Sequence, residues 1–219
     1  MLAKVLEGVM DPSRFDVLED AVTHQLLPRF LAHEGAKCGY WMLDPSTGHV
    51  ASISLWDDAD ALRGAARADG AERCSIFDRI SLRLLSINTM PVLAARILAA
   101  EAEEGQEANF GFGSMRLTWV EGVARSERDN LHHLYQEIVA DQLDSGGFRG
   151  SYWFGEEASG EGCAVSLWQH PADLAGSTSA SRRRRRRVAR SLGCRIGDAR
   201  EYQMIGWAEN PEVAARNRS

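Results

Sequence analysis

The feature of this sequence that most restricts its fold is an internal repeat. The stretch Tyr40–Trp56 occurs again as Tyr152–Trp168, 112 residues later, and both copies begin with Tyr-Trp and end with Ser-Leu-Trp. A glycine that suits a turn lies inside each copy, at Gly48 and at Gly160. A constant offset over this length indicates that one module was duplicated and fused, so the chain is predicted to contain two copies of one unit.

Each copy is predicted to have the element order β-α-β-β-α-β, from helical and alternating apolar spacing bounded by turn residues. In the first copy these elements are a strand at Lys4–Val9, a helix from Phe15 that Pro28 interrupts and Gly35 ends, hairpin strands around Tyr40-Trp41 and at Val50–Trp56, a helix from Asp57 and a strand at Ser81–Ile87. In the second copy they are Leu117–Val123, Leu131–Leu143, the hairpin Tyr152–Trp168, a helix from Pro171 and Glu201–Trp207. Glu7-Gly8-Val9 is aligned with Glu121-Gly122-Val123 as a further match.

These elements divide the chain into a first repeat at 1–93, a linker at 94–114, a second repeat at 115–210 and a C-terminal tail at 211–219. The linker begins with an Ala-rich stretch that is compatible with a helix. A unit of this size gains stability by burying its apolar sheet face, so the two repeats are expected to dock on each other. The predicted state is a monomer that acts as an intrachain pseudo-dimer, with a further homodimer left open.

Two segments, Val50–Leu62 and Cys163–Leu174, resemble the most recognisable stretch of the antibiotic-biosynthesis monooxygenase domain, in which a strand ends in Trp and a polar helix start follows. That domain belongs to the dimeric α+β barrel superfamily. The resemblance implies an α+β fold in which two ferredoxin-like repeats pair their antiparallel sheets into one intrachain barrel.

The resemblance also implies a function, which is a cofactor-independent monooxygenase acting on an aromatic or polyketide-like small molecule of secondary metabolism. Such enzymes carry an Asn four residues before the strand Trp, where this chain has Ser52 and Ala164. This departure supports the alternative of a non-catalytic member that binds a small molecule or a protein. A haem-binding tandem barrel is the third alternative, and without haem no cofactor is expected.

The candidate pocket lies where Trp56 and Trp168 end their strands. Side chains at alternate strand positions share one face, so each indole lies beside small residues, Ser52 in the first copy and Ala164 and Ser166 in the second. Small side chains beside a large aromatic leave room for a flat ligand. The competing interpretation, which is favoured, is that both indoles only fill the core.

Three further residues complete the predicted site. Tyr40 and Tyr152 could hydrogen-bond a phenol or an enolate, although packing in the barrel seam is the favoured interpretation of both. His170 follows Trp168 closely, and an imidazole titrates near neutral pH. Chemistry is therefore predicted in the second repeat, with His170, Trp168 and Tyr152 as catalytic residues. The predicted substrate-binding residues are Ser52, Trp56, Tyr40, Ala164 and Ser166.

The run Arg182–Arg187 stands out in a chain of net charge −6. Six arginines on a helix would face all sides, and no aromatic residue is interleaved for base stacking. The run is predicted to be a solvated insertion that neutralises the acidic first half, and no specific nucleic-acid partner is expected.

The chain is predicted to be cytoplasmic. No apolar run approaches the roughly 20 residues that a membrane helix needs, and the start lacks a signal-peptide core, so no membrane partner is expected. The four cysteines form no Cys-x-x-Cys pair, which favours reduced thiols and no metal site.

Overall fold

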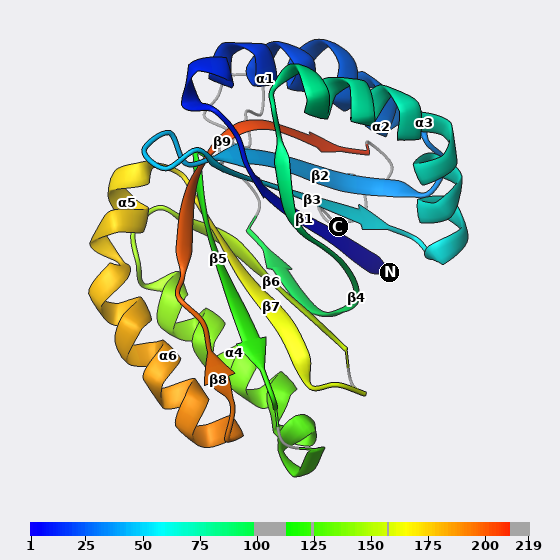
Figure 1. Cartoon of the computed structure of the whole chain (residues 1–219). Helices are drawn as coiled ribbons and strands as arrows, with labels where there is room; N and C mark the ends of the chain where they lie inside the picture. The colour runs from blue at the N-terminus through cyan, green and yellow to red at the C-terminus, as the bar shows by residue number, and fades with distance from the viewer. Residues whose placement is uncertain (99–112, 124, 157, 211–219) are drawn as a thin grey trace, which may run out of the picture. The chain divides into compact units, whose positions relative to one another are not determined.

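The computed structural model describes residues 1–98, 113–123, 125–156 and 158–210, and these form two compact units (Figure 1). The first unit consists of Met1–Thr89 and the chain from Tyr202 onward, and the second unit is Met90–Glu201. Both units carry antiparallel strands with helices on one face, so the predicted α+β class is confirmed.

The elements that begin in the first repeat follow the predicted order. They are β1 (Leu2–Val9), a 3-10 turn (Pro12–Arg14), α1 (Phe15–Ala21), a π-helical turn (Val22–Leu26), α2 (Leu27–Ala32), β2 (Ala36–Leu43), β3 (His49–Trp56), α3 (Ala59–Arg79) and β4 (Arg83–Ile97). The π turn lies directly before Pro28, which is in the first turn of α2. The break that Pro28 predicts is thus a π turn inside a continuous helical segment, one of the common ways in which a helix is distorted.

The remaining elements match the second predicted set closely. They are β5 (Ser114–Glu121), a 3-10 turn (Arg125–Asn130), α4 (Leu131–Leu143), β6 (Phe148–Glu156), β7 (Glu161–Trp168), α5 (Pro171–Gly176), α6 (Thr178–Leu192), β8 (Arg195–Ile196) and β9 (Arg200–Glu209). The bounds of α4 are those predicted from its apolar spacing.

Two strands, β4 and β9, are shared between the units. Residues from Met90 onward in β4 pair with β6 inside the second unit, for example Val92 with Phe154. Residues from Tyr202 onward in β9 pair with β2 inside the first unit, for example Trp207 with Tyr40. The hydrogen-bonded order is β7-β6-β4-β1-β3-β2-β9-β5-β8 with a further β7–β5 pairing.

This sharing differs from the predicted division at residue 93. Residues 94–97, predicted to begin the linker with a possible helix, continue β4. Each repeat therefore gives its last strand to the other unit. The rest of the predicted linker, from 99 to 112, and the predicted tail at 211–219 lie outside the described residues.

The strand registers place equivalent residues in the two units. Leu2 pairs with Trp56, and Ser114, 112 residues later, pairs with Trp168. Glu7 therefore corresponds to Trp119, and the predicted match of Glu7 with Glu121 is wrong by two residues. Glu7 is also buried, at 4% exposure, and accepts a hydrogen bond from the Tyr202 hydroxyl at 3.0 Å.

Apolar side chains between each sheet and its helices form the cores. In the first unit the core residues include Leu18, Val22, Val50, Ile76 and Ile80, from α1, the π turn, β3 and the end of α3. In the second unit they include Leu134, Ile138, Val188 and Leu192, from α4 and α6. The helices are therefore held on the sheets by their apolar faces.

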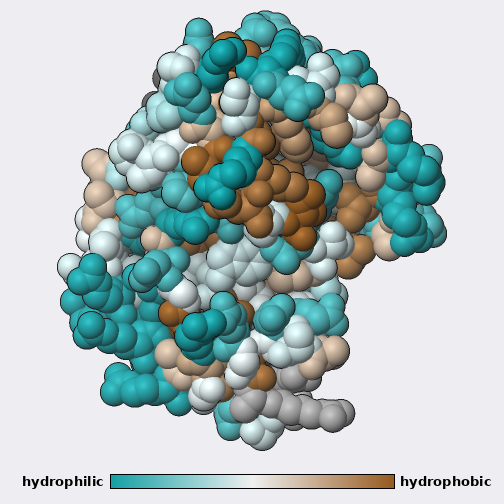
Figure 2. All heavy atoms as spheres, in the orientation of Figure 1, coloured by the Kyte–Doolittle hydropathy of each residue, from teal (hydrophilic) through white to brown (hydrophobic). Residues whose placement is uncertain are grey.

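The surface carries both apolar and charged regions. Leu84, Leu85 and Ile87 on β4 are exposed, and Figure 2 shows apolar side chains gathered where β4 runs in Figure 1. Hydrophilic side chains cover α6 in the same view. No helix in the described part of the chain is long and apolar enough to cross a membrane.

Candidate functional site

Each unit contains a cavity between its sheet and its helices. The first cavity has a volume of about 110 Å³ and lies between the strands β1 to β3 and the helices α1 to α3. The second has a volume of about 120 Å³ and lies between the strands β5 to β7 and the helices α4 and α6. Each cavity is formed by residues of one unit alone.

The first cavity has a polar floor made by strand residues at alternate positions. Ser52, Ser54 and Trp56 of β3 line it together with Lys4, which pairs with Ser54 across the β1–β3 ladder. Trp41 of β2 supplies a second aromatic wall. Strand alternation thus places two hydroxyls and one ammonium beside two indoles.

A histidine–carboxylate pair lies on the helix side of this cavity. His33 ends α2 and Asp69 lies on α3, and His33 Nε2 is 2.7 Å from Asp69 Oδ2. Both side chains are largely buried, with 20% and 14% exposure, and both line the cavity. A carboxylate that accepts a hydrogen bond from one imidazole nitrogen leaves the other nitrogen as a proton acceptor. The pair can therefore act as a general base.

Lys4 is one of three cationic residues that line the first cavity, with Arg29 and Arg73. Burial lowers the pKa of Lys4, and the nearby Arg73 lowers it further. No ion pair of Lys4 is found within the described residues. A half-buried ammonium without a carboxylate partner is placed to attract an anion.

The two strand tryptophans make the same local contact. The Trp56 indole donates a hydrogen bond to Ser54 Oγ at 2.9 Å, and the Trp168 indole donates one to Ser166 Oγ at 2.9 Å. Trp56 packs edge-on against Phe30 with ring centroids 5.3 Å apart, and it also lines the first cavity. Trp168 packs against Phe148 and Leu174 at 1% exposure and lies outside the lining of the second cavity.

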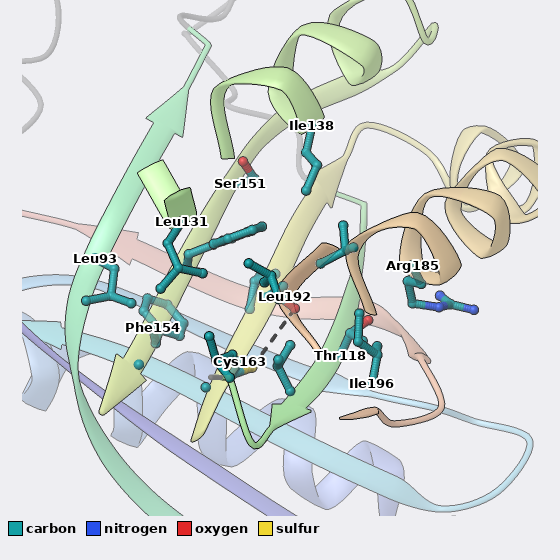
Figure 3. A pocket seen from close by; sticks show the side chains of 18 of the residues that line it. Leu93, Thr118, Leu131, Ile138, Ser151, Phe154, Cys163, Arg185, Leu192 and Ile196 are labelled. Atoms are coloured by element: carbon teal, nitrogen blue, oxygen red, sulfur yellow. Dashed lines mark hydrogen bonds between the residues drawn. The ribbon is translucent and has the colours of Figure 1, made fainter. Parts of the chain in front are cut away.

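The second cavity is mainly apolar. Figure 3 shows Leu93, Phe154 and Leu131 on one side of it and Arg185 on the other. Thr118, Ser151 and Ser166 add hydroxyls from three strands, and Gln142 adds an amide from α4. Two acidic residues, Glu156 and Glu161, pair across the β6–β7 hairpin end and are both exposed.

Arg116 occupies the position in the second unit that Lys4 occupies in the first. It is 3% exposed, and its Nη2 lies 2.7 Å from Glu201 Oε1. It also donates hydrogen bonds to the Leu174 carbonyl and to the hydroxyls of Ser177 and Thr178. Because these partners engage most of its N–H groups, Arg116 mainly joins β5 to the start of α6.

The arginine run forms part of α6, and this corrects its predicted role as a solvated insertion. Residues at spacings of three and four share a helix face, which places Arg184 and Arg185 beside Ser181 and Val188. Both arginines line the second cavity. Burial lowers the pKa of Arg184 and of Arg185. The other four arginines of the run are exposed, as the sequence predicts.

The cavities include only some of the predicted site residues. Ser52 and Trp56 line the first cavity, and Ala164 and Ser166 line the second. Four predicted residues line neither, namely Tyr40, Tyr152, Trp168 and His170. Both tyrosines are buried on the opposite strand face, where Tyr152 stacks on Phe154, and His170 is exposed at the start of α5.

Sequence reasoning missed His33, Asp69 and Lys4. A signal for Asp69 existed, because Leu62, Ala65, Asp69 and Ile76 recur at helical spacing along α3 and place one carboxylate among apolar residues. No local signal pairs it with His33, which is 36 residues away in the sequence. In the sequence, the only signal for Lys4 is that it is a polar residue within an apolar strand.

Haem does not fit these cavities. The lining of the second cavity includes no histidine in the described residues, and His170 lies outside it. In the first cavity, His33 Nε2 is already engaged by Asp69. Volumes of about 110 and 120 Å³ are close to that of a cavity of about 150 Å³ that holds benzene, whereas a porphyrin is several times larger.

No family model matches the chain, and no curated protein matches its sequence. Solved structures do match. A candidate monooxygenase from Fusobacterium nucleatum subsp. nucleatum aligns over 95% of this chain and 94% of its own, with a TM-score of 0.65 and 9% identity. An anthrone oxidase-like protein aligns over 97% and 94%, with a TM-score of 0.61 and 15% identity.

A candidate monooxygenase from Lactobacillus acidophilus aligns over 95% of this chain and 96% of its own, with a TM-score of 0.60 and 10% identity. At these identities the likeness shows the fold alone. The chain therefore has the fold of monooxygenase-like α+β proteins.

Proposed function

We propose that the chain is a cofactor-independent monooxygenase-type enzyme whose active site is the first cavity. The observation that carries the proposal is the His33–Asp69 pair, which lines the same cavity as the unpaired cation of Lys4. A base and a cation on one cavity suit a substrate that becomes an anion. The substrate class is a small aromatic molecule with an acidic C–H next to a carbonyl group.

The reaction needs only the substrate and dioxygen. His33 removes a proton from the activated CH₂ group, and the electron pair left behind is delocalised as an enolate. The enolate reduces dioxygen and forms a C–O bond, which gives a hydroperoxide after protonation. Removal of the second C–H proton breaks the O–O bond and expels hydroxide, which takes up a proton to become water. The balance is R₂CH₂ + O₂ → R₂C=O + H₂O.

The protein groups have separate roles in this scheme. The carboxylate of Asp69 stabilises the imidazolium that forms when His33 accepts a proton. The Lys4 ammonium stabilises the enolate oxygen, and Trp41 and Trp56 hold the aromatic ring and exclude water. His33 and Lys4 come from α2 and β1, and the proposal places the substrate ring between this base and this cation.

We also propose that the two units are diverged copies of one module. The shared 112-residue offset of the β1–β3 and β5–β7 registers supports this, as do the equivalent indole-to-serine hydrogen bonds. In this proposal the two copies kept the same strand registers, and the residues that line their cavities diverged. The second unit has Arg116 where the first has Lys4, and none of its cavity residues is a histidine in the described chain.

Phenylacetone is a suitable test substrate, because its CH₂ group lies between one aromatic ring and a ketone and its single ring suits a cavity of about 110 Å³. The full-length protein should consume dioxygen and form 1-phenylpropane-1,2-dione, followed with an oxygen electrode and by absorbance. His33→Gln should lower kcat at least 100-fold, as expected for loss of a general base. Asp69→Asn should lower kcat less and should shift the rising part of the pH–rate profile, because it acts through His33.

The matched control is His24→Gln, which removes an exposed histidine near the same helix. This variant should keep the parent kcat. If parent and His33→Gln turn over phenylacetone equally fast, or if His24→Gln lowers kcat as much, the assignment of His33 as the base is wrong. A parent protein that binds phenylacetone and consumes no dioxygen would support the second candidate, a non-catalytic binding protein of this fold.

A further inference from the structure

The second cavity contains polar atoms that the protein leaves without partners. Arg184 Nε is buried and makes no hydrogen bond within the described residues, and its closest carboxylate oxygen, Asp141 Oδ2, is 3.8 Å away. Gln142 Oε1 is likewise buried without a hydrogen bond. Both residues line the cavity. Buried polar groups without partners are rare in folded proteins, so each one indicates a missing partner.

The charges around these atoms are not balanced. Asp141 is shared, since it lies 3.0 Å from Arg187 as well as 3.8 Å from Arg184. Glu201 is bound by Arg116, and it attracts Arg185 only at longer range, together with Asp198. Among the residues that the structure describes, the Arg185 guanidinium donates a hydrogen bond to Ser181 Oγ at 3.3 Å. Four guanidinium groups therefore face three carboxylates at the α6 side of the cavity.

The opposite part of the cavity is apolar. Leu93, Leu131, Trp153 and Phe154 line it, and a volume of about 120 Å³ is close to that of a cavity that holds one benzene ring. The acidic residues of the lining, Glu156 and Glu161, lie at the hairpin end of β7, while Ser166 at the arginine side is five residues further along the strand. At about 3.3 Å per residue these two ends are roughly 16 Å apart.

We infer that the second cavity binds a small aromatic carboxylate, with its ring between Leu131 and Trp153 and its carboxylate on Arg184 and Arg185. A guanidinium binds a carboxylate through charge-assisted hydrogen bonds, and Arg184 Nε supplies an unused donor. This site lies in the second unit and is separate from the active site proposed in the first.

Two neighbouring arginines of α6 allow a matched comparison, because they differ in whether they line the cavity. Arg184 faces the cavity, whereas its neighbour Arg183 is exposed and lines no part of it. Substitution of either one removes the same charge from the same helix. A ligand held by a specific contact depends on Arg184 alone, whereas a ligand attracted by the general field of the run depends equally on both.

The experiment uses the full-length protein with 4-hydroxybenzoate and its uncharged isostere 4-hydroxybenzamide. Dissociation constants come from isothermal titration calorimetry, and the site is located by indole ¹H–¹⁵N resonances. Trp153 reports on the second cavity, and Trp41 and Trp56 report on the first. We expect the carboxylate to bind at least tenfold more tightly than the amide and to shift Trp153.

In the variants, Arg184→Gln should weaken binding of the carboxylate at least tenfold, and Arg183→Gln should change it less than twofold. His33→Gln should leave it unchanged, so failure of this site and failure of the proposed active site can be told apart. Equal binding of acid and amide, a shift confined to Trp41 and Trp56, or equal losses in both arginine variants would each overturn the inference. If Arg184→Gln does not fold, the inference is tested with Arg185→Gln, which should also weaken binding of the carboxylate. The dissociation constants of the acid and the amide for the parent protein test it as well.

Discussion

Replacement of Arg116 by Met tests how the second unit is held together. The guanidinium is 3% exposed and joins β5 to Glu201 at the start of β9 and to the Leu174 carbonyl at the end of α5. Met keeps most of the side-chain volume and removes every donor. The variant therefore loses polar contacts and creates little empty space.

The cost can be worked out from these contacts. Removing one partner of a buried ion pair costs about 3–5 kcal/mol because the other charge stays buried. Glu201 is 39% exposed and regains water, and the Leu174 carbonyl keeps its hydrogen bond from Ser177 Oγ at 2.7 Å. We therefore expect the free energy of unfolding to fall by about 2–4 kcal/mol.

Urea denaturation followed by tryptophan fluorescence measures this change. The control is Arg183→Met, which removes an exposed arginine and should change the free energy of unfolding by less than about 0.5 kcal/mol. A neutral or stabilising Arg116→Met would refute the reasoning, because the desolvation of the ion pair would then outweigh its attraction.

Two further predictions concern the first unit. Lys4→Met should raise the melting temperature at pH 7 and lower any turnover, because burial penalises an ammonium that has no ion-pair partner in the described residues. The folded-state pKa of Lys4 lies below 10.5, the value in the unfolded chain. The parent protein therefore becomes more stable as the pH rises from that lowered pKa toward 10.5. Over this pH range the difference in melting temperature between Lys4→Met and the parent, measured by thermal melts, should shrink. Gly48→Ala should lower the free energy of unfolding by at least about 1–2 kcal/mol, because φ is +76° and a Cβ atom would lie 2.4 Å from the Met10 carbonyl oxygen. Gly64→Ala, in open space on α3, should raise it by about 0.5–1 kcal/mol in the same urea titrations, and a loss at Gly64 equal to that at Gly48 would contradict the steric argument.

Local elements were predictable from the sequence because their signals are local. The apolar spacing of Leu131–Leu143 gave the bounds of α4, and the hairpin glycines gave the turns, with φ of +76° at Gly48 and +72° at Gly160. The exchange of β4 and β9 was not predictable. It depends on which distant strand each one pairs with, and the apolar pattern of a strand does not name its partner.

The site was harder to predict than the fold. The strand Trp and Ser positions followed from alternation, and Ser52 and Trp56 line the first cavity. The His33–Asp69 pair was missed, because His33 ends one helix and Asp69 lies within another, and only packing brings them within 2.7 Å. The arginine run was misjudged, because an average over a helix hides the two positions that face inward.

Lys4 and Arg116 occupy equivalent positions, and they show how the same strand register can place a cation in two cavities of different composition. Each lies opposite the serine that holds the strand Trp, at Ser54 or Ser166, so the backbone sets the same place for a cation in both units. In the second unit Glu201 neutralises that cation and hydroxyls engage its donors, so it stabilises the fold. In the first unit no ion pair neutralises Lys4 within the described residues, and a base lies across the same cavity. A charge that the fold does not neutralise costs stability, and such a cost is typical of groups retained for function. The first cavity is therefore the one in which the proposed anion-forming reaction would have both a base and a cation.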